Sequence, residues 1–225
     1  MSGFPLREIR SYARRERPLG GAALAARERL WGRLAVPEND WHRLGAGPRD
    51  VVLDIGFGDG ESLLTQAAGD AARDYVGVEV YRAGLVKVLR GIEQAGLTNV
   101  RVVEADAHDL VRKIGDRRVS AVQVFFPDPW PKTRHHKRRL VQGPFLAEVA
   151  RILRPGGMLH LATDWAPYAD AMQDAAASVP SLTFHEDGRA ERPWTRFERR
   201  GLKLGQPARD LRFLRAVDAG APNEP

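Results

Sequence analysis

The chain has 225 residues, enough for one sizeable domain, and its 43% hydrophobic and 28% charged residues are ordinary for a globular protein. It has no cysteine, which excludes disulfides, thiolate metal sites and cysteine nucleophiles. The net charge of +6 is uneven: residues 1–33 carry +5 and residues 188–215 carry +6, around a middle of −3. Basic ends favour a polyanionic partner such as a nucleic acid.

Apolar runs alternate with segments of helical spacing from residue 50 onward. We expect strands at 50–57, 74–81, 99–106, 119–127 and 158–164, and two final strands at 182–187 and 209–217. Helices are expected at 60–68, 82–96, around 139–153 and at 166–179, with a turn at 154–157. Strands separated by helices predict an α/β fold with a mostly parallel, doubly wound, seven-stranded sheet and helices on both faces.

The same pattern divides the chain into three parts. Residues 1–33 are a basic N-terminal arm, helical in part from about 20 to 33, residues 34–217 are the domain, and 218–225 are a tail. The arm lacks the apolar centre of a secretory signal, and no apolar run reaches the roughly 18 residues of a membrane span. We therefore expect a cytoplasmic protein with no membrane contact.

Three glycines directly follow the first expected strand, in "LDIGFGDG". Gly56, Gly58 and Gly60 permit a sharp turn and close approach of a ligand to the backbone. Glu61 breaks the second half of the dinucleotide fingerprint, which counts against NAD, and no Walker lysine is present. Asp54, just before the loop, suits a ligand that carries an ammonium group, as S-adenosylmethionine does.

Carboxylates also close the next two strands. Glu79 can accept hydrogen bonds from both ribose hydroxyls of an adenosine, and Asp106 can accept from the adenine amino group. Either acid alone is as readily a surface or helix-capping residue. Together with Asp54 and the glycines, they predict a nucleoside cofactor, with S-adenosylmethionine preferred.

The segment "FFPDPWPKTRHHKRR" (125–139) follows the fourth expected strand. Pro127 and Pro129 restrict the backbone on both sides of Asp128, so we expect its carboxylate to be held in place before a ligand arrives. Five basic residues lie between 132 and 139. His135 and His136 have no third ligand at a suitable spacing, so no metal is expected.

Three blocks, "LDIGFGDG", "PDPWPKTRHHKRR" and "TRFERRG" (195–201), together strongly resemble the bacterial tRNA (guanine-N7-)-methyltransferase family. The glycine block is common to most class I methyltransferases, whereas the other two are far more specific. The resemblance covers residues 9–217 and implies a Rossmann-like class I methyltransferase fold. It also implies an enzyme that uses S-adenosyl-L-methionine to methylate N7 of guanine 46 in the tRNA variable loop, forming 7-methylguanosine.

The resemblance further implies roles for individual residues. The residues expected to bind the cofactor are Asp54, Gly56, Gly58, Glu79, Asp106 and Asp128. Asp128 is also the candidate catalytic residue. The residues expected to contact the substrate are Lys132, Asp164, Thr195, Arg196, Phe197 and Glu198. The family commonly has Glu in place of Asp54 and Lys in place of Arg196, and both differences keep the charge.

The acceptor atom explains why carboxylates are expected without a proton-transfer role. Guanine N7 carries a lone pair and no proton, so methylation needs no general base. The purine becomes cationic, and a fixed carboxylate stabilises that charge. We expect Asp128 to position methyl donor and base, and Asp164 to help read the guanine edge.

Two other interpretations stay open on the sequence alone. One is a class I methyltransferase acting on a different RNA base or on a small molecule. The other is a non-catalytic RNA-binding protein that kept the fold. The expected partner is tRNA, and we expect either a monomer or a homodimer.

Overall fold

The computed structural model of the protein describes residues 18–187, 189 and 192–217. In chain order the elements are α1 (Gly21–Leu34), the 3-10 helix η1 (Glu38–Arg43), β1 (Val51–Ile55), α2 (Glu61–Gly69), β2 (Asp74–Glu79), α3 (Arg82–Ala95), β3 (Val100–Glu104), α4 (Ala107–Lys113), β4 (Val119–Phe125), the 3-10 helix η2 (Thr133–Arg138), α5 (Gly143–Ile152), β5 (Leu153–Thr163), α6 (Ala166–Ala177), β6 (Leu182–Asp187), α7 (Arg196–Lys203) and β7 (Arg209–Arg215). None of the helices in these ranges is long and apolar enough to cross a membrane.

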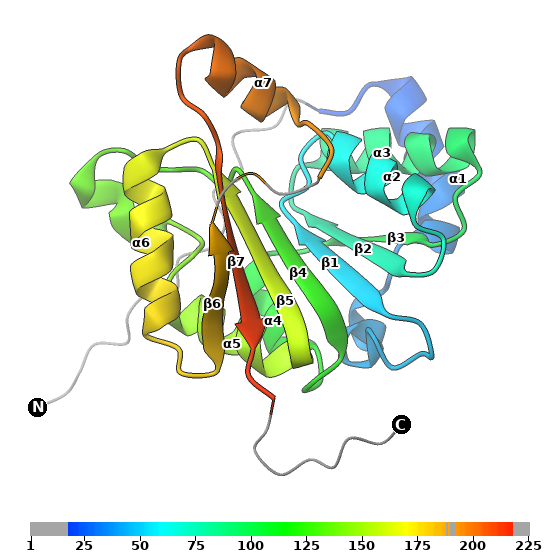
Figure 1. Ribbon diagram of the computed structural model, residues 1–225. Coiled ribbons are helices and arrows are strands. Elements are labelled where there is room, and N and C mark those ends of the chain that lie inside the picture. Colours follow the sequence, from blue (N-terminus) through cyan, green and yellow to red (C-terminus); the bar gives the residue numbers. More distant parts are fainter. Residues whose placement is uncertain (1–17, 188, 190–191, 218–225) are drawn as a thin grey trace, which may run out of the picture.

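Within the described ranges, seven strands form one sheet in the order β3-β2-β1-β4-β5-β7-β6 (Figure 1). Strands β1 to β5 pair in parallel, and β7 is antiparallel to both β5 and β6. The strand order reverses between β1 and β4, which is where ligands bind in open α/β sheets, outside the carboxyl ends of the strands. The predicted doubly wound, mostly parallel sheet is confirmed.

Side chains of β1 alternate between the two faces of the sheet. Val51, Leu53 and Ile55 belong to the core that α4, α5 and α6 cover, whereas Val52 belongs to the core under α1, α2 and α3. Because successive residues of a strand point to opposite faces, Asp54 shares the face of Val52. Its carboxylate therefore lies on the α2 and α3 side, directly before the glycine turn.

Besides its 3-10 helices, the described part of the chain contains two short α-helices that the sequence pattern does not predict. Helix α4 follows directly after Asp106, whose carboxylate caps it by accepting a hydrogen bond from the His108 amide at 2.9 Å. Helix α7 forms over "RFERRGLK", an eight-residue segment whose only large apolar residues are Phe197 and Leu202, too few to establish a helical spacing. Both helices are short, so the pattern has fewer than three turns in which to show itself.

Several boundaries also differ from the predicted ones. Helix α5 begins at Gly143 rather than near 139, because η2 takes up residues 133–138. Strand β5 begins at Leu153, so the predicted turn at 154–157 lies inside this strand. The pairing of β5 with β4 changes register between Val119 and Ala121 of β4. The α1 helix confirms the one expected from 20 to 33, and its Leu30 and Leu34 are buried in the core. Residues 1–17 and the tail 218–225 lie outside the described residues.

Candidate active site

The glycine loop, residues 56–60, turns away from the end of β1 in left-handed backbone conformations. Gly56, Gly58 and Gly60 have φ of 78°, 57° and 75°, which L side chains rarely adopt. A Cβ on Gly60 would stand 2.0 Å from Val88 of α3, so glycine is required there by packing as well. A Cβ on Gly56 or Gly58 would have no heavy atom within 4 Å, which leaves this side of the loop open to a ligand.

Asp54 lies beneath this loop as a buried carboxylate. Its exposed fraction is 2%, and among the described residues its side chain has no hydrogen-bond or ion-pair partner. Burial, with a further contribution from the negative charge of Glu79, raises the pKa of Asp54 to about 7. A cationic group that binds at the open side of the loop would stabilise the ionised form of this buried acid.

Glu79, at the end of β2, shapes the same loop. One carboxylate oxygen accepts from the Gly58 amide at 2.9 Å, and the other accepts from the amides of Val80 (2.7 Å) and Tyr81 (3.1 Å). These bonds tie the loop after β1 to the loop after β2. A carboxylate has about four acceptor positions, so Glu79 keeps capacity for about one further donor.

The segment after β4 is bent by two unusual backbone conformations. Phe126 and Trp130 have φ of 52° and 44°, and left-handed conformations of such bulky residues are costly outliers, typical of functional sites. Between them lies Asp128, which is exposed and whose side chain forms no hydrogen bond with a described residue. The backbone is fixed instead: the Arg139 guanidinium donates to the Pro129 carbonyl at 2.9 Å.

The neighbourhood of Asp128 can be located from the side chains around it. Burial, with a smaller contribution from the Asp128 charge, raises the pKa of Tyr168 in α6 to about 12. Arg139 also lies over the Tyr168 ring, 4.7 Å from its centroid. Because Arg139 contacts both the Pro129 carbonyl and the Tyr168 ring, the segment that carries Asp128 lies beside the start of α6. Because β4 lies between β1 and β5, this segment and the glycine loop share one edge of the sheet.

Helix α7 lies over this edge (Figure 1) and contacts both segments. Arg199 pairs with both oxygens of Glu61, at 2.6 and 2.7 Å, and Arg196 pairs with Asp59 at 3.3 Å, so two arginines hold the helix to the glycine loop and α2. The Phe197 ring stacks on Phe126, with centroids 6.5 Å apart. Thus the block "TRFE" (195–198) meets both the glycine loop and the bend after β4.

The remaining expected substrate residues differ in their accessibility. Thr195 caps α7 by accepting from the Glu198 amide at 3.1 Å. Glu198 itself is 1% exposed and ion-paired with buried Arg192, so its substrate contact stays a prediction that requires this pair to open. Asp164, at the end of β5, is half-buried, and its Oδ2 lies 3.0 Å from where a Cβ on Gly201 of α7 would stand. Lys132 is exposed at the start of η2.

Sequence reasoning does not identify the residues that hold α7 in place. Asp59 looks like an ordinary loop residue, and Glu61 falls in the helix expected at 60–68. The basic run of residues 188–215 favours contact with a polyanion for Arg192 rather than burial beside Asp210. Their contacts join positions as far apart as Glu61 and Arg199, so no local spacing could have revealed them. The one available signal is the position of Arg192 three residues before the "TRFE" block.

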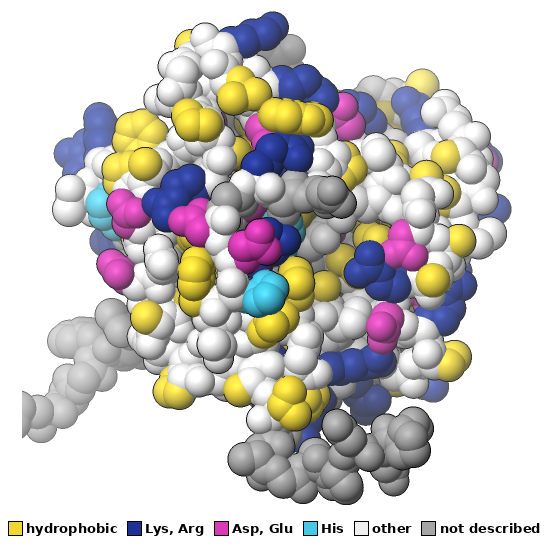
Figure 2. Space-filling view, viewed as in Figure 1, with side chains coloured by type: hydrophobic (Ala, Val, Ile, Leu, Met, Phe, Trp, Pro, Cys, Tyr) yellow, Lys and Arg dark blue, Asp and Glu magenta, His cyan; other side chains and the backbone are white. Residues whose placement is uncertain are grey.

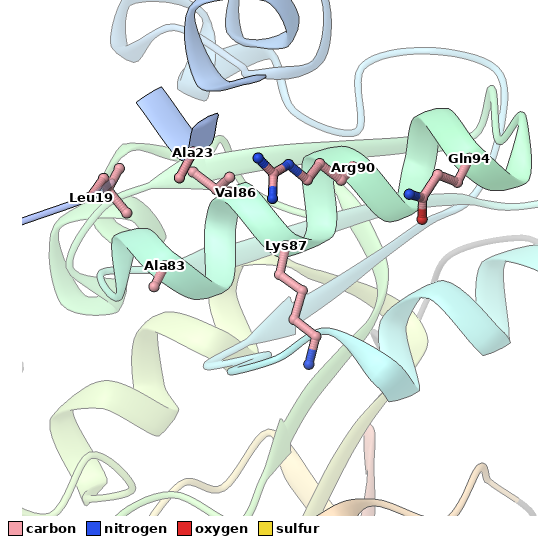
Figure 3. Close-up of a pocket in the computed structure, with 7 residues that line it drawn as sticks. All are labelled: Leu19, Ala23, Ala83, Val86, Lys87, Arg90 and Gln94. Atoms are coloured by element: carbon pink, nitrogen blue, oxygen red, sulfur yellow. The ribbon is translucent and has the colours of Figure 1, made fainter. Parts of the chain in front are cut away.

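The open side of the glycine loop forms a shelf that is distinct from two hollows in the described surface. A hollow of about 260 Å³ lies between the start of α1 and α3 (Figure 3), and another of about 500 Å³ lies beside Trp41 and α4. Asp106 lines the second, but residues 54–60 line neither. In Figure 3, Lys87 extends from α3 away from Arg90, and its ammonium pairs with Asp59 at 3.0 Å.

Figure 2 shows basic and apolar side chains mixed at the surface over α7, where Phe197 is 50% exposed.

Among the described residues, no group of three or more His, Asp or Glu side chains is arranged to hold a metal ion. The groups at this edge of the sheet are instead the open glycine loop, the buried carboxylate of Asp54, the exposed acids Glu61 and Asp128, and the arginines of α7. These groups suit a cationic nucleoside ligand on one side and a polyanion on the other.

Comparisons with known proteins identify relatives of nearly the same length. Residues 48–211 match the family model described as "Putative methyltransferase". The chain is 46% identical to the tRNA (guanine-N(7)-)-methyltransferase of Halorhodospira halophila, over 95% of this chain and 98% of that one. It is 42% identical to the protein of the same name from Nitrosococcus oceani, over 96% and 94% of the two chains.

Solved structures support the fold. The 16S rRNA methyltransferase KamB superposes with a TM-score of 0.58 at 19% identity, over 80% of this chain and 94% of that one. An antibiotic-related methyltransferase gives the same TM-score at 18% identity, over 82% and 96%. At such identities the likeness concerns the fold alone. On the near full-length similarity to the curated relatives, the chain belongs to the tRNA (guanine-N(7)-)-methyltransferase family.

Proposed function

We propose that the protein transfers a methyl group from S-adenosyl-L-methionine to N7 of guanine 46 in the tRNA variable loop. The observation that carries the proposal is α7: one short basic helix touches the glycine loop through Arg196, the start of α2 through Arg199, and the bend before Asp128 through Phe197. A helix placed in this way meets a nucleic acid and borders the cofactor shelf at the same time. Similarity to relatives named tRNA (guanine-N(7)-)-methyltransferase supports the substrate.

The cofactor shelf fits S-adenosylmethionine by its chemistry. Buried, unpartnered Asp54 suits the ammonium group, and the open sides of Gly56 and Gly58 admit close approach. The remaining acceptor capacity of Glu79 suits one ribose hydroxyl rather than the two expected from the sequence, because three amides already use this carboxylate. Asp106 would accept from the adenine amino group in addition to the amide it caps. When bound, S-adenosylmethionine supplies an electrophilic methyl group on a cationic sulfur.

The acid beside the guanine acts through its charge rather than by moving a proton. N7 has no proton to lose, and the ring gains positive charge as the methyl group is transferred. Asp128, exposed on a backbone fixed by Arg139 and two prolines, would stabilise that charge and help align the reactants. Asp164 would accept from the guanine N1–H and amino group, which adenine cannot match.

The cationic surface beside these acids would hold the tRNA backbone. Arg134 and Lys137 in η2 are exposed, as are Lys132 before it and Arg196 and Arg200 of α7. Thr195 keeps its own O–H for a substrate acceptor, and Phe197 offers an exposed ring for stacking. Phosphate contacts position without reading sequence, so the choice of guanine rests on tRNA shape and on the acids.

Incubation with radiolabelled S-adenosylmethionine and unmodified tRNA tests the proposal. We expect label in the tRNA, chain cleavage at position 46 after borohydride and aniline treatment, and no label in a tRNA that carries adenine at that position. Label at another nucleotide would support a different RNA base as the substrate. Binding of tRNA without transfer would support the non-catalytic alternative.

A further inference from the structure

A group of charged side chains is buried beneath α7. We call it the Arg192 cluster; its members are Arg192, Glu198 of α7, Asp210 of β7 and His160 of β5. The side chains of Arg192, Glu198 and Asp210 are each 1% exposed or less. The cluster therefore cannot contact a ligand directly in this arrangement, and any contribution to function must pass through the residues it holds.

Arg192 uses its planar fork on two carboxylates at once. Its Nε and Nη2 donate to the two oxygens of Asp210, at 2.6 and 2.9 Å, and its Nη1 donates to Glu198 at 2.7 Å. This arrangement requires the guanidinium shape, which an ammonium group does not reproduce. It joins the segment before α7, the first turn of α7 and the start of β7 at one point.

The charges of the cluster balance with little help from solvent. Asp210 also bonds His160 at 2.7 Å, and Glu198 also bonds Arg189 at 3.1 Å. Bonds from His160 and Arg192 hold the pKa of Asp210 below its ordinary value despite its burial. Buried ion pairs are poor contributors to stability compared with well-packed apolar side chains, so stability alone is a weak reason for this cluster.

The cluster also touches the strained bend that carries Asp128. The Arg192 guanidinium lies over the Phe125 and Phe126 rings, 5.1 and 5.4 Å from their centroids. Phe126 has the left-handed φ of 52°, a conformation that persists only when its surroundings hold it. The Phe126 ring lies near the guanidinium and also stacks on Phe197 of α7, and Asp128 follows two residues later.

We propose that Arg192 is a positioning residue for methyl transfer: its fork on Glu198 and Asp210 holds α7 against Phe126 and thereby fixes the place of Asp128. This inference rests on the proposed function, because it concerns the rate of that reaction. It requires that weakening the fork lowers kcat more than it weakens binding of tRNA or S-adenosylmethionine. The residues that meet the tRNA phosphates and the cofactor shelf are unchanged by such a substitution.

The test compares Arg192→Lys with Arg151→Lys. Arg151 is also held by several bonds, to Asp116 at 2.6 Å, to Glu148 at 2.8 Å and to two carbonyls, but it lies near the amino end of β4, far along the sheet from α7. We expect kcat on tRNA to fall about 10- to 100-fold in Arg192→Lys, with KM for both substrates within about threefold. In Arg151→Lys we expect kcat to stay within about twofold even where Tm falls equally.

A second variant separates positioning from stability. Arg192→Met with Asp210→Asn removes one charge of each sign and leaves the pair between Glu198 and Arg189 in place. We expect its Tm to equal or exceed that of Arg192→Lys while kcat stays low. Three results would each overturn the proposal. The first is a double variant in which kcat recovers together with Tm, and the second is an Arg151→Lys variant in which kcat falls in step with Tm. The third is an Arg192→Lys variant in which KM rises while kcat is unchanged.

Amide hydrogen exchange provides a readout that does not depend on activity. In Arg192→Lys, the amides of residues 196–203 should exchange at least tenfold faster, while those of α5 keep the wild-type rate. If the wild-type protein transferred no methyl group to tRNA, the proposed function would fail, and the exchange data would still decide whether Arg192 holds α7. Unchanged exchange over α7 would overturn the positioning role whatever the activity.

Discussion

The half of the sheet built from β1, β2 and β3 and the half built from β4, β5 and β7 reach the same carboxyl edge by different means. In the first half, glycines make an open backbone turn, and Glu79 ties the loop to its own neighbours by bonds to amides. Asp54 lies beneath without a partner among the described side chains. This half is held by backbone and presents an unpaired acid to a small ligand.

In the second half, side chains hold the geometry. Arg139 fixes the Pro129 carbonyl, the Arg192 cluster fixes α7, and Phe197 covers Phe126. The bonds join residues that are far apart in the sequence, and the surface is rich in exposed arginine. This difference suits a small cofactor on a preformed shelf and a large, flexible acceptor that must be aligned.

The largest effect should come from removing the charge at the bend. Asp128→Asn keeps the shape and abolishes the negative charge that faces the cationic purine, so we expect turnover on tRNA to fall about 10²-fold. Single-turnover rates at saturating cofactor and tRNA measure this directly. Asp174→Asn, an exposed aspartate of α6, is the matched control. If turnover on tRNA fell only a few-fold in Asp128→Asn, the electrostatic role of Asp128 would be refuted. The contribution of this segment would then be limited to aligning the reactants on a backbone that the prolines restrict.

A smaller but double effect is expected at Asp54. Asp54→Asn should weaken binding of S-adenosylmethionine about 10-fold or more at pH 8, because the ammonium group loses its buried anion. The same change should stabilise the ligand-free protein at pH 8. The folded-state pKa of about 7 lies above the ordinary 3.8, so the folded state binds more protons than the unfolded state between these values, and stability falls as pH rises through that window.

Calorimetric titration and thermal unfolding at pH 5 and pH 8 measure both effects. The stability gain should be about 2 kcal/mol at pH 5 and should rise to at most ~4 kcal/mol at pH 8, because the window begins near the ordinary pKa of 3.8. Wild-type affinity for the cofactor should also weaken below pH 7, where Asp54 is protonated, and the Asn variant should lack this dependence. Equal stability of the two proteins at pH 8 would show that the Asp54 carboxylate already has a partner without the cofactor.

The two halves also differ in how far the sequence predicts them. The glycine turn and the acids at the ends of β1 and β2 follow from local spacing, because a strand must end where its glycines begin. The same holds for the mostly parallel, doubly wound sheet, since alternating strands and helices admit few arrangements. For Asp54 even the buried face follows from the alternation along β1.

The arrangement of the second half could not be predicted in this way. The "TRFE" block stands out only by resemblance, and its eight-residue helix has only two large apolar residues, Phe197 and Leu202, by which a pattern could reveal it. Arg192 looks like any surface arginine until Asp210, 18 residues later, is brought beside it by the turn of α7 into β7. Such sites depend on long-range contacts, which neither composition nor periodicity records.

A moderate effect is expected from the exposed cations of the second half. Replacing Lys132, Arg134 and Lys137 together by Ala should weaken tRNA binding and reduce the slope of log K against log salt concentration by about one for each phosphate that is no longer neutralised. Filter binding from about 50 to about 200 mM salt measures the slope. Arg49→Ala, beside Asp74 at the other edge of the sheet, should leave it unchanged. A wild-type affinity that is flat over this range would contradict the tRNA assignment.

The smallest effect should come from Glu61→Gln, which breaks the exposed pair between the two halves. The side chains of Glu61 and Arg199 are each nearly half exposed, so the pair contributes about 0–1 kcal/mol to stability, and we expect kcat/KM on tRNA to change by no more than about threefold. Steady-state kinetics of Glu61→Gln and Arg192→Lys, measured under the same conditions, compare the surface pair with the buried cluster. If Glu61→Gln lowered kcat as far as Arg192→Lys, the surface pair rather than the buried fork would hold α7. The half of the sheet that carries the glycine loop and the half that carries Asp128 would then be held together by an ion pair at the surface.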